Sequence, residues 1–154
     1  MEEEKSYWLC IGNSKNWSIV KERKIWGVSE RHRNIIRKVR EGDFLIFYTI
    51  MEKSGGQLIQ PQIRGVYKAS SKPFIENTKV FMAPGGKEER FPHRVKLEPV
   101  YVPENPASFK KLIPELEFIT NKERWNTHLF GRAMRKISKR DFETIFSALK
   151  EGNY

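Results

Sequence analysis

Two tryptophans near the start of the sequence have the chemistry to hold a planar ligand. Trp17 lies in a polar run, residues 13–18, where no apolar stripe supports burial. Trp26 precedes Gly27, a residue that lets a backbone or a planar ligand come close to the chain. Lysines and arginines surround both, and aromatic faces in a basic field are what stacking on nucleic-acid bases requires. The alternative for Trp26 is a core position that plugs one end of a small barrel.

The charge of the chain favours a polyanionic partner. The formal net charge is +10, from 29 lysines and arginines against 19 aspartates and glutamates. Residues 21–40 hold eight cations and two acids, and residues 132–140 hold five cations and no acid. Two separate basic segments predict a patch formed in space, with nucleic acid as the first candidate partner.

The sequence offers little for catalysis or for a metal. Cys10 is the only cysteine and lies in an apolar run, so it is predicted to be a small core residue. His32, His93 and His128 lie far apart, without metal-ligand spacing. The chain contains no G-x-S-x-G motif, no P-loop and no dinucleotide fingerprint. These features predict a binding protein that uses no cofactor and no metal.

No apolar run approaches the length that spans a bilayer. The acidic start of the sequence is unlike a signal peptide. We therefore expect a cytoplasmic protein without a membrane partner.

The elements that must position these residues alternate irregularly. Apolar runs predict strands over residues 7–11, 43–50, 64–69 and 93–97. Ser29 is predicted to start a helix that runs to about residue 40, and an S-x-x-D cap starts another over 139–150. Between the first strand and Trp26, only a helical turn around 17–23 is expected. Because a regular βαβ alternation is absent, we expect a small, partly open barrel with helices on its flanks instead of a doubly wound sheet.

Five short segments, in their order and spacing, resemble the EVE domain: residues 7–9 (YWL), 25–28 (IWGV), 42–48 (GDFLIFY), 65–67 (GVY) and 91–95 (FPHRV). That family belongs to the PUA-like barrels and is related to the YTH domain, which reads methylated adenine in RNA. The resemblance covers essentially the whole chain. It implies an α+β fold, a PUA-like mixed β-pseudobarrel flanked by short helices, formed as a single domain over residues 1–154.

The resemblance also implies a site, an aromatic-lined pocket that takes in a single, often modified, nucleobase from RNA or DNA. In the related YTH pattern, an Asn after the first strand contacts the base, and a Trp before a small residue forms one wall. The loop before residue 94, which supplies the second wall in YTH domains, holds no Trp here, and its nearest apolar candidates are Phe81 and Met82. The residues expected to bind the base are Trp26, Trp17, Asn13, Ser14, Phe81 and Val28. The residues expected to contact phosphate are Arg31, Arg33, Arg94, Arg132, Arg135 and Lys136.

Two other functions compete with this interpretation. The first is a PUA-like, ASCH-type enzyme that acts on a nucleoside or small molecule, although no acid–base or nucleophile set supports it. The second is a basic adaptor that docks on acidic protein surfaces. Salt-sensitive binding that Trp26→Ala leaves unchanged would indicate the adaptor.

Overall fold

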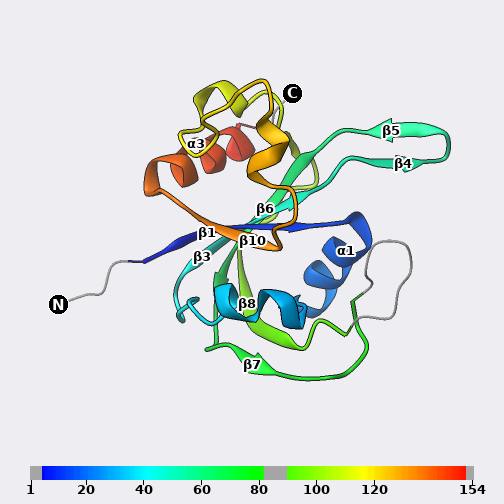
Figure 1. Ribbon diagram of the computed structural model, residues 1–154, viewed down its shortest axis with the longest axis vertical. Coiled ribbons are helices and arrows are strands. Elements are labelled where there is room, and N and C mark those ends of the chain that lie inside the picture. Colours follow the sequence, from blue (N-terminus) through cyan, green and yellow to red (C-terminus); the bar gives the residue numbers. More distant parts are fainter. Residues whose placement is uncertain (1–4, 82–89, 152–154) are drawn as a thin grey trace.

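The computed structural model describes residues 5–81 and 90–151. Its centre is a mixed sheet with the main strand order β10-β1-β3-β6-β8-β2, curled into a half-barrel (Figure 1). These six strands are β1 (Tyr7–Gly12), β2 (Ile25–Val28), β3 (Phe44–Thr49), β6 (Gln62–Ala69), β8 (His93–Tyr101) and β10 (Met134–Ile137). Two short strands join the sheet, β7 (Phe74–Ile75) beside β8 and β9 (Ala107–Ser108) beside β6.

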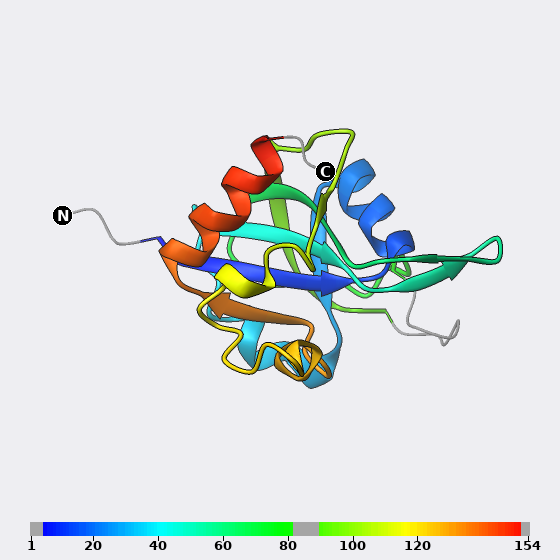
Figure 2. The ribbon, with the colours of Figure 1, turned by 90° about the horizontal axis from the view of Figure 1, so that it is seen from above.

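Helices cover both faces of the sheet. The α-helices are α1 (Ser14–Arg23), α2 (Arg33–Ile36) and α3 (Lys139–Lys150), and three 3₁₀ turns span Glu30–His32, Ile113–Glu115 and Trp125–His128. In Figure 1, α3 lies over one face, and α1 and α2 lie over the other. A separate hairpin of β4 (Glu52–Ser54) and β5 (Gln57–Ile59) projects from the body, as Figure 2 shows.

Strand β1 lies between β10 and β3, and its two faces contact two different apolar cores. It pairs parallel to β3 and antiparallel to β10. Because successive side chains of a strand point to opposite faces, Leu9 packs with the α3 core while Trp8 and Cys10 pack with the core beneath α1 and α2. The buried Cys10 confirms its predicted role as a small core residue, and burial raises the pKa of its thiol.

A buried carboxylate fixes the start of β1 against the start of β3. Asp43 accepts hydrogen bonds from the Ser6 amide at 3.0 Å, the Trp8 indole N–H at 3.0 Å and the Arg40 amide at 2.9 Å. Three donors satisfy a carboxylate that is only 1% exposed, so its burial carries little penalty.

The structure confirms the four predicted strands and the C-terminal helix. Ser138 caps that helix by accepting a hydrogen bond from the Asp141 amide at 3.0 Å. The helix predicted from Ser29 to residue 40 is wrong in length, because a 3₁₀ turn and the short α2 replace it. The chain turns after Ile36 so that Val39, 2% exposed, enters the core, and β-branched residues are weak helix formers.

The helix α1 is longer than the turn expected there. Asn13 caps it by accepting a hydrogen bond from the Asn16 amide at 2.8 Å, and Lys24 ends it in the left-handed conformation. Only Asn16 and Val20 of this helix are buried, so its sequence carries little apolar periodicity.

Candidate functional site

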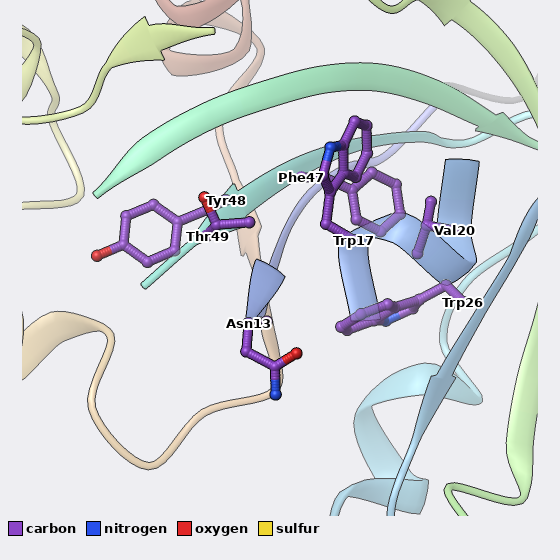
Figure 3. A pocket seen from close by; sticks show the side chains of 8 residues that line it. Asn13, Trp17, Val20, Trp26, Phe47, Tyr48 and Thr49 are labelled. Carbon is purple, nitrogen blue, oxygen red and sulfur yellow. The ribbon is translucent and has the colours of Figure 1, made fainter. Parts of the chain in front are cut away.

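A hollow lies where the end of β1 meets α1, β2 and β3 (Figure 3). Its empty volume is about 180 Å³ when the open solvent at its mouth is counted, but the enclosed part is only about 10 Å³, the space of roughly one water molecule. The residues that line it are Gly12, Asn13, Trp17, Val20, Trp26, Phe47, Tyr48 and Thr49. Three of the six predicted base-binding residues, Asn13, Trp17 and Trp26, therefore come together at one place.

Three aromatic rings form the apolar walls of this hollow. The ring centroids of Trp26 and Phe47 lie 5.4 Å apart, edge to face at 74°, and those of Trp17 and Phe47 lie 5.9 Å apart at 37°. Figure 3 shows Trp17 and Trp26 on different sides of Phe47. Trp26 is only 4% exposed, whereas Trp17 is partly exposed. Trp26 is therefore both a core residue and a wall of the hollow.

Two glycines shape the space around the tryptophans. A Cβ on Gly12 would lie 3.6 Å from the six-membered ring of Trp26, an ordinary contact, so the missing side chain leaves part of the hollow empty. A Cβ on Gly65 of β6 would lie 3.2 Å from the Trp17 ring and 3.3 Å from the Tyr101 carbonyl oxygen. Gly65 therefore lets the Trp17 indole lie against the sheet.

Polar groups stand at the mouth of the hollow. The Asn13 side-chain oxygen caps α1 and lies at the edge of the site. Thr49 accepts a hydrogen bond from Nε of Arg64 at 3.1 Å, which brings a cation to the lining. Burial lowers the pKa of Arg64, and the nearby Glu52 carboxylate partly offsets this. Burial also raises the pKa of Tyr48, so its phenol stays neutral at physiological pH.

Phe47, Tyr48 and Arg64 are not among the site residues predicted from the sequence. The first two lie in the apolar run that predicts a strand over residues 43–50, and such a run indicates a core without showing which ring borders a hollow. Arg64 lies on β6, and only the pairing of β6 with β3 brings it to Thr49.

Ser14, Val28 and Phe81 lie outside the lining of the hollow. Ser14 holds the projecting hairpin instead, because its amide and its hydroxyl donate to Glu52 at 2.6 Å and 3.1 Å. Val28 is 1% exposed and belongs to the core beneath α1 and α2. Met82, the other apolar candidate for a second wall, lies outside the described residues.

The ring of Phe81 packs against the backbone of Gly27, in the space that a side chain there would fill. A Cβ on Gly27 would lie 2.9 Å from the Phe81 ring and 2.9 Å from the Phe91 carbonyl oxygen. Since neighbouring residues of a strand face opposite sides, Phe81 lies across β2 from Trp26. The planar group that Gly27 accommodates is therefore a ring of the protein itself.

Arg94 is expected from the sequence to contact phosphate. This expectation is wrong, because the side chain is fully buried. Its guanidinium donates to Phe91 O at 3.0 Å, Glu76 Oε2 at 3.0 Å and Thr78 Oγ1 at 2.9 Å. Further bonds run to the carbonyl oxygens of Thr78 and Arg90, the latter at 2.9 Å. Burial lowers its pKa and the Glu76 carboxylate raises it. The N–H groups of this guanidinium bond to the segment before β8, so they are not available to bind a phosphate.

The other predicted cations divide between the two faces of the sheet. Lys136 is exposed and stands opposite Trp8 in the β1–β10 register, on the face that α2 covers. Arg31 is exposed in the 3₁₀ turn before α2, and Arg33 lies 3.6 Å from the Glu30 carboxylate. Arg132 is exposed just before β10.

Arg135 stands opposite Leu9, on the α3 face. Its guanidinium lies 4.6 Å from the Phe118 ring centroid and donates to the His128 carbonyl at 3.1 Å, and burial lowers its pKa. This side chain is packed against the protein, in contrast to the exposed Lys136 next to it.

Within residues 5–81 and 90–151, no group of three His, Cys, Asp or Glu side chains is arranged to hold a metal ion. The same residues contain no helix long and apolar enough to cross a membrane.

A curled mixed sheet with short helices on both faces defines a PUA-like fold, and the aromatic hollow lies beside the end of β1. The EVE domain family matches residues 6–148, so the chain belongs to the EVE domain family. A UPF0310 protein of Pyrococcus abyssi is 44% identical over 146 residues, which are 94% of this chain and 99% of that protein.

Two solved structures share the fold at low sequence identity. Human THYN1 protein, in complex with 5-methylcytosine-containing DNA, is 17% identical, with 95% of this chain and 98% of that chain covered and a TM-score of 0.62. The YTH domain of Zygosaccharomyces rouxii MRB1 protein, in complex with N6-methyladenosine RNA, is 14% identical, with 96% and 88% covered and a TM-score of 0.57. These likenesses confirm the predicted α+β PUA-like half-barrel.

Proposed function

We propose that this protein binds RNA or DNA and takes a single modified base into the hollow between Trp17 and Trp26. The observation that carries the proposal is the hollow itself, because three aromatic rings from separate elements surround a space that opens to solvent. The THYN1 and YTH structures support it, since both proteins are bound to nucleic acid that carries a methylated base.

The physical chemistry of the hollow suits a methylated base. Stacking on an aromatic side chain contributes about 1–3 kcal/mol per base. Burial of one methyl group adds roughly 0.8 kcal/mol, so an enclosed apolar wall favours the methylated form by a few-fold. Asn13 and the Thr49–Arg64 pair supply polar groups at the mouth, where the edge of a base carries its hydrogen-bonding atoms.

A single stacked base cannot hold a nucleic acid tightly, so phosphate contacts must add to the affinity. Arg31, Arg33, Arg132 and Lys136 are at least partly exposed and serve this role in the proposal. Arg94 and Arg135 are excluded because the protein itself holds their guanidinium groups.

We propose binding without turnover. The Cys10 thiol is fully buried, and the carboxylates of Asp43 and Asp141 accept backbone N–H groups inside the protein. None of these three residues lines the hollow. Conversion of a nucleoside by the purified protein would favour the enzyme alternative.

The test compares methylated and unmodified nucleosides by thermal shift and calorimetry. Trp17→Ala should weaken binding of the preferred nucleoside about 5- to 150-fold, the equivalent of losing one stacking contact. Trp17 is the better probe because Trp26→Ala empties a buried site and should cost roughly 3–5 kcal/mol of stability. The matched control is Trp125→Ala, a partly buried tryptophan that packs on Phe109 and lies outside the lining. Equal binding by wild type and Trp17→Ala would contradict the proposed site.

A further inference from the structure

Phe130 exposes its aromatic ring to solvent on the turn before β10. Its side chain is 87% exposed, and no other Phe, Tyr or Trp among residues 5–81 and 90–151 is more than partly exposed. Exposure of one large ring costs burial energy that a core position would recover. The ring is therefore accessible to a ligand.

The turn that carries the ring is held in place by its own contacts. The Phe130 amide donates to the Asn126 carbonyl at 2.8 Å, and the Arg132 amide donates to the Leu129 carbonyl at 3.2 Å. Leu129 is 5% exposed and packs in the α3 core, and Gly131 takes the left-handed conformation that the turn requires, with φ +76°. The ring of Phe130 is thus directed outward by a fixed backbone.

The chain that follows the turn passes close to the end of β1. The Ala133 carbonyl accepts a hydrogen bond from the Ile11 amide at 2.8 Å, and Gly12 and Asn13, which follow Ile11, line the hollow. Figure 1 shows the orange segment that carries this turn leading into β10. Three residues of chain span at most about 10 Å, so Phe130 lies within a few nucleotides of a base in the hollow.

The surroundings of the ring are basic. Residues 121–136 contain five lysines and arginines and one acid, and Arg132 is exposed two positions from Phe130. An aromatic face next to a guanidinium stacks a base and holds its phosphate at the same time. A protein partner would call for a contiguous apolar patch. Among the described residues, the other exposed large apolar side chains come from other segments: Ile50, Met51, Leu58, Ile59, Ile75 and Val100. Of these, Ile50 lies beside the end of β1, where its amide donates to the Gly12 carbonyl at 3.0 Å.

We propose that Phe130 stacks on the base of a nucleotide that flanks the one in the hollow, while Arg132 contacts its phosphate. This inference rests on the proposed function and deepens it, because it adds a contact to a nucleotide next to the one in the hollow. A free nucleoside would occupy the hollow and leave Phe130 uncovered.

The experiment measures the affinity of the preferred base in two forms, as a free nucleoside and at the centre of a single-stranded pentanucleotide. Phe130→Ala should weaken binding of the pentanucleotide about 5- to 150-fold and leave binding of the nucleoside unchanged. Phe130→Trp should retain the pentanucleotide affinity, because a larger ring still stacks. The control is Ile75→Ala, which removes an exposed apolar side chain, 65% exposed, from β7 and should affect neither ligand.

Unchanged pentanucleotide affinity in Phe130→Ala would overturn the inference and assign the ring to another partner, such as a protein. An equal loss for both ligands would also overturn it, since the ring would then belong to the hollow. Trp17→Ala separates the two proposals, because it tests the nucleoside site alone. Wild-type protein that binds neither ligand would overturn both.

Discussion

The Trp26 side chain is part of the core and also forms a wall of the hollow. Its indole N–H is buried, and no acceptor for it is found in the part of the chain that the structure describes. A buried donor without an acceptor costs about 1–3 kcal/mol. A bound molecule whose oxygen or nitrogen reached this N–H would recover part of that energy. Residues that are structural in the free protein can in this way contribute to affinity.

Gly12 offers the sharpest single-residue test of the hollow. Gly12→Ala places a methyl group 3.6 Å from the Trp26 ring without a clash, and Gly12→Val fills more of the same space. The folded protein should be unchanged or stabilised by about 0.4–1 kcal/mol in the alanine variant, because glycine loses more chain entropy on folding. Nucleoside affinity should fall from glycine to alanine to valine.

Urea unfolding and calorimetric titration of the three Gly12 proteins check this prediction. A loss of binding together with a loss of stability would indicate a folding defect. Full nucleoside affinity in Gly12→Val would show that the base binds elsewhere.

At the level of elements, Arg94 ties the segment before β8 to the sheet. Arg94→Lys keeps the charge but replaces a planar fork of donors with a single ammonium group, so several of its five hydrogen bonds must be lost. We expect a loss of at least about 2 kcal/mol in the free energy of unfolding, since each bond to a charged group contributes about 1.5–3 kcal/mol.

The urea midpoint of Arg94→Lys, measured beside Lys96→Ala, checks this prediction. Lys96 is exposed on the same strand, and its removal should change stability by less than about 0.5 kcal/mol. Equal midpoints for the two variants would mean that Arg94 does not hold the segment.

Arg94 also shows where a sequence pattern stops being informative. The phosphate contact expected of Arg94 requires an exposed guanidinium, but Arg94 is buried whereas Lys96, on the same face of β8, is exposed. Alternation along a strand shows which residues share a face of the sheet. It does not show that the segment before β8 folds back and covers Arg94 on that face. The strands themselves were predictable because their apolar runs are long and clearly bounded. The helix α1 was not, because only two of its residues are buried and its capping residue, Asn13, is common in loops.

The candidate site was predictable in part for the same reasons. Trp17 and Trp26 could be predicted as site residues because basic residues surround them in the sequence. Phe47 did not, because an aromatic residue inside a strand usually belongs to the core. Its place in the hollow depends on α1 and β2 meeting β3, which local sequence does not encode.

For the molecule as a whole, the two faces of the sheet differ in the cations they offer. Arg31, Arg33 and Lys136 lie on the α2 side, whereas Arg135 packs on Phe118 and Arg140 lies 3.6 Å from Glu117 on the α3 side. The basic surface predicted from sequence is therefore divided by the sheet.

Salt dependence tests this division. The slope of log affinity against log salt should be about −0.7 for each phosphate contact with a single strand. Arg31→Glu combined with Lys136→Glu should therefore make the slope shallower by about 1.4 and weaken binding to all sequences alike. Arg140→Glu, on the other side, should leave the slope unchanged. An affinity for oligonucleotides that does not vary with salt would exclude phosphate contacts.

The pairing of β1 has a consequence for how the protein is made. β1 needs β3 on one edge and β10 on the other, and Tyr7 pairs with Ile137 across nearly the whole sequence. Contacts between distant parts of a chain form slowly, because a long loop must close before any pairing compensates for the lost entropy. During synthesis, β1 is made before β10 and keeps one edge unpaired until residues 134–137 follow it. A growing chain therefore keeps one edge of this apolar strand unpaired until β10 is made, whereas all residues that line the hollow are made by residue 49.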